Sequence, residues 1–198
     1  MKKILIGALV GGILIFIWQF LSWSLLNTHK SSQQYTPDHE AIMSVLNNNL
    51  EEGGYLLPGM PDDASMDDYE KYLAANEGKP WATIQYHKAM KTNMTMNMIR
   101  GLLVNIITVW LLCWIIVRLK QPAFGTIFTA ALFTGIIVFL NVPYTNHIWY
   151  ETFDLYAHLT DALVSWGLCG LWLAWWFSRN NVRKLPVRNN TVEEMNIA

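Results

Sequence analysis

Four long stretches without charged residues constrain the fold of this chain. They span residues 4–24, 101–117, 123–140 and 162–177. Each stretch, with its flanks, approaches the ~20 residues that a helix needs to cross a bilayer. A 198-residue chain with 53% hydrophobic and 15% charged residues is also too apolar for an ordinary soluble domain. We therefore predict a mainly α fold, a four-transmembrane-helix bundle.

The segment between the first two apolar runs predicts a small α/β extracytoplasmic cap. Thr36-Pro37 and Ser65 are suitable helix starts, and residues 55–58 and 81–87 resemble short strands. Its core is too small for independent stability. The predicted order is transmembrane helix 1 (1–26), cap (27–98), transmembrane helices 2 (99–119) and 3 (122–141), outer loop (142–152), transmembrane helix 4 (153–178) and cytoplasmic tail (179–198).

The distribution of basic residues predicts the orientation of the bundle. Eight of them fall on the side that would hold both termini: Lys2, Lys3, Arg118, Lys120, Arg179, Arg183, Lys184 and Arg188. Basic residues near helix ends favour the cytoplasmic side. The first apolar run lacks the small-residue cleavage site of a signal peptide, so we expect it to remain as an anchor.

Three short motifs resemble those of a group of uncharacterised small bacterial inner-membrane proteins. They are SWSLLNTH at residues 22–29, GYLLP at 54–58 and GKPWA at 78–82. In that group a Ser-Trp pair and a downstream histidine close the first helix. This chain has Leu-Asn-Thr-His where the group has Leu-Pro-Trp-His. The resemblance implies a bacterial envelope location and no catalytic residue. Together with the orientation above, we expect a bacterial inner-membrane protein with its cap in the periplasm.

Polar side chains concentrate in the outward halves of the predicted helices. They are Gln19, Asn105, Asp154, His158, Asp161 and Ser165. Spacings of four, three and four place the last four on one face of the fourth helix. This pattern favours a polar pocket open to the outside, where a carboxylate beside an imidazole could hold a proton, an ion or a ligand. The alternative is that this helix projects above the hydrocarbon and its charges are hydrated.

The five histidines all fall on the outer side in this topology. They are His29, His39, His87, His147 and His158. Together with Asp154 and Asp161 they could converge on zinc or copper, although no pair has the spacing of a known metal motif. Scattered histidines of ordinary frequency are the alternative.

Methionines before the second apolar run offer a second metal hypothesis. On a continuous helix, His87, Met90, Met94 and Met98 would share a face that could bind Cu(I). Packing by flexible apolar side chains explains the same spacing and is the favoured interpretation.

Gly7 and Gly11 predict a close helix contact, because small residues four apart let two backbones approach. The sequence leaves open whether this contact is internal or forms a dimer.

The sequence contains no phosphate-binding loop, serine-nucleophile motif or nucleic-acid-binding face. We therefore expect a non-enzymatic accessory or partner-binding subunit of an envelope complex. Its expected partners are the lipid bilayer and another envelope protein or a second copy, and no nucleic acid. The alternative function is an outward-facing protein that binds copper, zinc or a small ligand through His, Asp and Met residues.

Overall fold

The computed structural model describes residues 1–61 and 63–179, and the predicted tail beyond residue 179 lies outside this part. The fold is mainly helical, at 69% helix, with one small two-stranded sheet. The chain forms two compact units. Of the described residues, the first unit contains 1–32 and 95–179, and the second contains 33–61 and 63–94.

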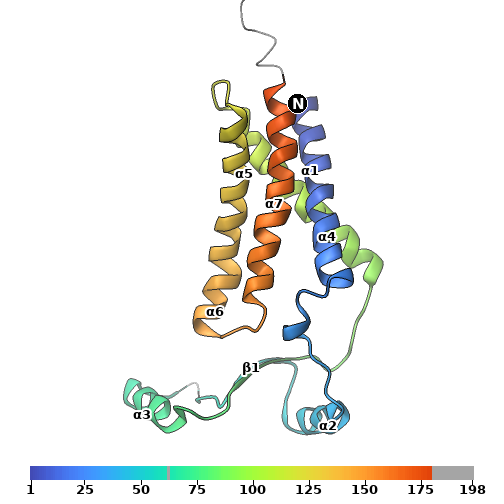
Figure 1. The fold of residues 1–198 in the computed structure, drawn as a ribbon. Coiled ribbons are helices and arrows are strands. Elements are labelled where there is room, and N and C mark those ends of the chain that lie inside the picture. Colours follow the sequence, from blue (N-terminus) through green and yellow to red (C-terminus); the bar gives the residue numbers. More distant parts are fainter. Residues whose placement is uncertain (62, 180–198) are drawn as a thin grey trace, which may run out of the picture. The chain divides into compact units, whose positions relative to one another are not determined.

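The first unit is a bundle of long helices, in which α7 packs between α1 and α5 (Figure 1). Its elements are α1 (Lys2–Phe20), a π-helix (Leu21–Leu25), a 3-10 turn (Lys30–Ser32), α4 (Met94–Ile116), α5 (Phe124–Phe139), a second π-helix (Leu140–Tyr144), α6 (Thr145–Trp149) and α7 (Leu155–Ser178). The predicted outer loop at residues 142–152 is therefore helical as far as Trp149.

Three helical segments of this unit are long and apolar enough to cross a membrane. They are Lys2–Leu25, Met94–Ile116 and Phe124–Trp149. The prediction of four such helices is corrected, because α7 does not share this apolar character. Its 24 residues are sufficient in length. However, His158, Asp161 and Ser165 make its first half polar, and tryptophans replace aliphatic residues in its second half.

The small residues of α1 mediate packing inside the chain. A Cβ atom on Gly7 would lie 3.1 Å from the Phe177 ring of α7, and one on Gly11 would lie 3.0 Å from Cys169 Sγ. Both glycines are buried. An added Gly11 Cβ would lie even closer, at 2.8 Å, to Val109 of α4. The contact that the sequence left open is therefore internal, and it joins α1 to both α7 and α4.

Gly12 makes the closest approach to a neighbouring backbone, and this gives a testable prediction. A Cβ atom there would lie 2.7 Å from the Ile106 Cα of α4. Gly12→Ala should therefore destabilise the bundle by about 1–3 kcal/mol, because a backbone atom cannot move aside as a side chain can. Gly167→Ala is the matched control, since nothing lies within 4 Å of its added Cβ. Thermal unfolding in detergent measures both, and equal midpoints would contradict the prediction.

The second unit contains two helices and a two-stranded sheet. They are α2 (His39–Asn49), β1 (Gly53–Leu57), α3 (Met66–Asn76) and β2 (Ala82–Tyr86). The strands pair antiparallel, with Tyr55 opposite Ile84. Ser65 caps α3 through a reciprocal hydrogen-bonded box with Asp68, as its position predicted. Helix α2, which the sequence predicted to begin at Pro37, begins at His39.

The second unit has little core of its own. Tyr86 is its one buried side chain among the described residues. Apolar side chains such as Ile42 and Val45 of α2 and Leu73 of α3 are exposed. A two-stranded sheet with so little covered apolar surface is marginally stable in water.

Candidate functional site

A tight turn after α1 brings His29 back against the bundle. The π-helix ends with Leu26 N–H donating to Leu21 O at 2.8 Å. Asn27 then adopts a left-handed conformation, with φ of 49°, and Thr28 N–H donates to Ser22 O at 3.1 Å. Asparagine tolerates this conformation better than most residues, so it can end a helix. The Ser22 and Thr28 hydroxyls lie 2.6 Å apart and fix the turn.

His29 lies between two carboxylates, that of Asp161 in α7 and that of Asp154 at the N-cap of α7. Its Nδ1 is 2.8 Å from Asp154 Oδ2, and its Nε2 is 3.0 Å from Asp161 Oδ2. The His29 side chain is only 2% exposed. Trp18 Nε1–H donates to the other oxygen of Asp161 at 2.9 Å. Trp18 before the turn and His29 after it therefore both bond Asp161 of α7, and His29 also bonds Asp154 at the N-cap of that helix.

Two further rings enclose the cluster. Trp23 stacks on His29 with ring centroids 3.8 Å apart and planes within 4°. The His158 ring lies edge-on to His29 at 4.7 Å between centroids. His158 Nε2 is 3.4 Å from Asp154 Oδ2, and its side chain is 32% exposed. The cluster is thus closed around His29 and accessible on the His158 side.

The electrostatics of the cluster favour an ionised Asp154. Burial by itself would raise the pKa of this carboxyl, but hydrogen bonds from His29 and Ser32 and the charges of the two imidazoles outweigh burial and lower the pKa below its usual value. A carboxylate beside two imidazole nitrogens has the character of a cation ligand.

Three residues of the cluster have the geometry of a metal site. One ligand atom each from His29, Asp154 and His158 lie within 4.8 Å of one another. If His29 Nδ1 binds a metal ion, its Nε2–H remains available to donate to Asp161. This pairing of a carboxylate with the far nitrogen of a ligating histidine is the usual second layer of zinc sites.

The predicted pocket residues divide into two groups. Asp154, His158 and Asp161 meet at the cluster, and His158 contacts Asp154 rather than the expected neighbour Asp161. Ser165 Oγ donates to the main-chain oxygen of Asp161 at 2.5 Å.

Gln19 and Asn105 form a separate contact between α1 and α4. Asn105 Nδ2 donates to Gln19 Oε1 at 2.7 Å. Because the two side chains bond each other across two helices, we interpret the pair as a polar link between α1 and α4.

The remaining histidines have other hydrogen-bond or ion-pair partners. His39 bonds the Thr36 main chain, and His87 pairs with Glu52. His147 Nδ1 accepts from Thr152 N–H at 3.0 Å. Of the five histidines, His29 and His158 are those that meet Asp154.

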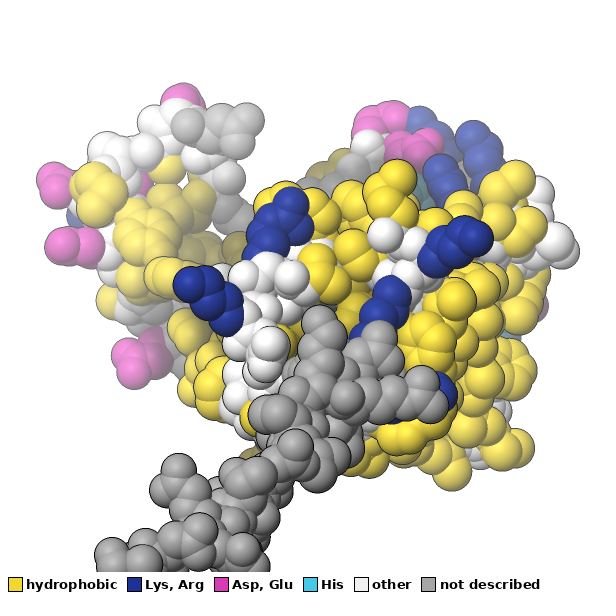
Figure 2. Space-filling model, turned by 90° about the horizontal axis from the view of Figure 1, so that it is seen from above, with side chains coloured by type: hydrophobic (Ala, Val, Ile, Leu, Met, Phe, Trp, Pro, Cys, Tyr) yellow, Lys and Arg dark blue, Asp and Glu magenta, His cyan; other side chains and the backbone are white. Residues whose placement is uncertain are grey.

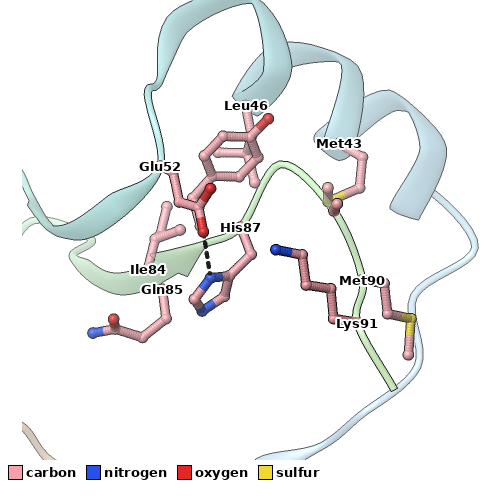
Figure 3. A pocket seen from close by; sticks show the side chains of 10 residues that line it. Met43, Leu46, Glu52, Ile84, Gln85, His87, Met90 and Lys91 are labelled. Atoms are coloured by element: carbon pink, nitrogen blue, oxygen red, sulfur yellow. Dashed lines mark hydrogen bonds and ion pairs between the residues drawn. The ribbon is translucent and has the colours of Figure 1, made fainter. Parts of the chain in front are cut away.

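The methionine hypothesis required a helix that does not form. Helix α4 begins at Met94, so His87 and Met90 lie in the irregular segment before it. They line a pocket of the second unit together with Met43, and Figure 3 shows the His87 ring turned toward Glu52. Met90 is 90% exposed and Met94 is 71% exposed. The four predicted copper ligands therefore share no helix face.

Sequence reasoning missed the two tryptophans of the cluster. Trp18 and Trp23 are five residues apart, which places them on different faces of an α-helix. The π-helix from Leu21 to Leu25 changes the angle between successive side chains around the helix, so α-helical spacing does not apply to this pair. The Ser-Trp pair and histidine of the family resemblance were the available signal, because they correspond to Ser22, Trp23 and His29.

Comparison with known proteins gives no relative from which a function can be transferred. No family model, curated protein or solved structure matches the chain.

Proposed function

We propose that this chain is a multi-pass membrane protein that binds a divalent transition metal ion, zinc in the first instance, at one end of its helical bundle. The observation that carries the proposal is the convergence of His29, Asp154 and His158 within 4.8 Å, with Asp161 on the far nitrogen of His29. Two imidazoles and one carboxylate form the ligand set of open zinc sites and also of non-haem iron(II) sites.

Two of the three distances between the candidate ligand atoms are close to those of a zinc site, and the third pair, His29 and His158, lies within 4.8 Å. Ligand atoms of a tetrahedral zinc site lie roughly 3.3 Å apart, given bonds of about 2.0–2.1 Å. His158 Nε2 and Asp154 Oδ2 are 3.4 Å apart, and His29 Nδ1 and Asp154 Oδ2 are 2.8 Å apart. Replacement of the hydrogen bond by a metal thus requires the second pair to separate by about 0.5 Å. The exposed edge of His158 offers the entry route.

Removal of one ligand tests the proposal. Purified protein is expected to bind one equivalent of zinc in competition with a chromophoric chelator, and His158→Gln should lose most of this binding. His158 is the suitable ligand to replace, because its partial exposure makes a folding defect less severe. His39→Gln is the matched control, since His39 is exposed in the second unit. Equal competition by all three proteins, or none by the wild type, would refute the proposed site.

For the topology, we propose that α7 also crosses a bacterial inner membrane, as part of the bundle, although it is less apolar than the three segments that could cross by length and composition. Both termini are then cytoplasmic. Support comes from the packing of α7 between α1 and α5, which shields its polar face, and from the basic residues at the helix ends.

Cysteine labelling distinguishes four crossings from three. In intact cells an impermeant thiol reagent should modify Tyr35→Cys, which is 81% exposed, and should not modify Ala198→Cys. The native Cys113 and Cys169 are buried and should give little background. With four crossings the C-terminus and the second unit are on opposite sides. Labelling of both positions in intact cells would indicate that α7 does not cross.

The exposed apolar surface of the second unit favours one additional role, that of a partner-binding subunit. Ile42 and Val45 of α2 are 47% and 61% exposed. A photoreactive side chain at Val45 should crosslink one defined protein or a second copy, whereas the same group at exposed Glu70 should not. Identical products from both positions would argue against a specific partner.

A further inference from the structure

Among the described residues, the end of the bundle that holds the N-terminus carries several cations and no carboxylate. Figure 2 shows Lys and Arg side chains standing among hydrophobic ones at the end that holds the N-terminus. The described residues at this end contribute Lys2, Lys3, Arg118, Lys120 and Arg179. The described helix ends and loop there, residues 1–8, 112–126 and 170–179, contain no Asp or Glu. Counter-ions for these cations must therefore come from the surroundings or from the rest of the chain.

Lys3 and Arg179 lie together where the start of α1 meets the end of α7. Lys3 Nζ donates to Phe177 O at 3.2 Å, and Trp176 Nε1–H donates to Lys3 O at 2.9 Å. The Arg179 guanidinium carbon lies 4.4 Å from the centre of the Trp175 ring. These contacts hold the side chains, but none of them neutralises either charge.

The surroundings of this pair distinguish a lipid from a free anion. Leu5 is 59% exposed, and Leu171 and Trp175 are 50% and 48% exposed. These side chains lie within two or three turns of the cations on the same helices. An anion that binds here and carries acyl chains would cover this apolar surface, whereas inorganic phosphate would leave it exposed. Tryptophan is also typical of the headgroup level of membrane proteins.

We propose that Lys3 and Arg179 form a binding site for the phosphate of an anionic phospholipid, whose acyl chains lie along α1 and α7. The charge pair supplies the attraction, and the adjacent indoles lie beside the glycerol region. Polybasic clusters next to membrane helices attract anionic lipids in this way. The site is at the opposite end of α7 from the His29 cluster, so it is independent of the proposed metal function.

Retention of lipid through purification tests this site. Protein equilibrated with detergent micelles that contain equimolar phosphatidylglycerol and phosphatidylcholine should retain phosphatidylglycerol preferentially in native mass spectrometry. Lys3→Gln/Arg179→Gln should reduce this preference by about fivefold for each charge removed. Lys71→Gln/Lys79→Gln, which removes two exposed charges from the second unit, should leave it unchanged.

Two further arms make the result decisive. Lys3→Arg/Arg179→Lys keeps both charges and should keep the preference, which separates lost binding from lost folding. An equal concentration of inorganic phosphate should not displace the lipid. The proposal is overturned by equal retention of the two lipids, by equal losses in the Lys3/Arg179 and Lys71/Lys79 variants, or by displacement with inorganic phosphate.

Discussion

Asp161→Asn is expected to bind zinc about 10- to 100-fold more weakly than the wild-type protein while still binding one equivalent. The Asp161 carboxylate does not itself ligate the ion. It accepts from His29 Nε2 and thereby leaves Nδ1 facing Asp154 and His158. In asparagine an NH2 donor replaces one of the two carboxylate oxygens, so one of the two positions that now face His29 and Trp18 no longer accepts a hydrogen bond.

A matched pair of variants separates this orienting role from direct ligation. Asp154→Asn removes a charged ligand and should abolish stoichiometric binding. Ser165→Ala removes only a hydrogen bond to the Asp161 main chain and should bind as the wild type does. Competition titrations with a chelator of known affinity measure all three variants. If Asp161→Asn bound zinc as tightly as the wild type, His29 would not depend on Asp161 for its orientation.

His29→Leu is expected to destabilise the metal-free protein by about 3–5 kcal/mol, because it leaves two carboxylates without their common partner in a buried site. The side chains of Asp154 and Asp161 are 5% and 15% exposed, so water can compensate little. For a chain of this size the loss corresponds to a fall in the unfolding midpoint on the order of 10 °C. Thermal unfolding in detergent without added metal measures it.

A compensating variant identifies the cause of this loss. In His29→Leu/Asp154→Asn/Asp161→Asn the uncompensated charges are absent, so the midpoint should recover in part. His39→Leu provides the control at an exposed histidine and should change stability by less than about 0.5 kcal/mol. An unchanged midpoint in His29→Leu would show that the ion-pair network contributes nothing to stability.

The sequence was most informative where one physical signal determines the structure. The uncharged runs predicted the long helices, because hydrocarbon tolerates few charges. Ser65 predicted a helix start because its hydroxyl can accept from a free amide of the first turn, and the structure adds a reciprocal hydrogen bond to Asp68. The strands at β1 and β2 were also predicted close to their observed bounds.

The sequence was misleading where local geometry departs from the α-helix. A continuous helix from His87 would have aligned the methionines, but α4 begins one residue after Asn93, a residue type favoured at helix starts. The fourth helix was predicted to begin at residue 153, yet it begins at Leu155 with Asp154 at the N-cap position. This position places the Asp154 carboxylate beside the turn that contains His29.

The candidate site could be predicted only in part. The spacing of Asp154, His158 and Asp161 showed that one end of α7 is polar, since residues three and four apart share a helix face. The partner His29 is 125 residues away from Asp154 in the chain, and its position depends on the π-helix and on the left-handed Asn27. Neither feature has a periodic signal. The sequence predicted that all five histidines lie on one side of the membrane. It could not show that His29 and His158 are the two that meet at Asp154.

Anomalous diffraction from zinc-loaded crystals is the most direct test of the proposed metal site. The account predicts one zinc peak bonded to His29 Nδ1, Asp154 Oδ2 and His158 Nε2 at about 2.0–2.2 Å, with His29 Nε2 still bonded to Asp161. X-ray absorption on the same protein in detergent should give a first shell of nitrogen and oxygen that includes imidazole. A zinc ion held elsewhere, or a first shell without imidazole, would contradict it.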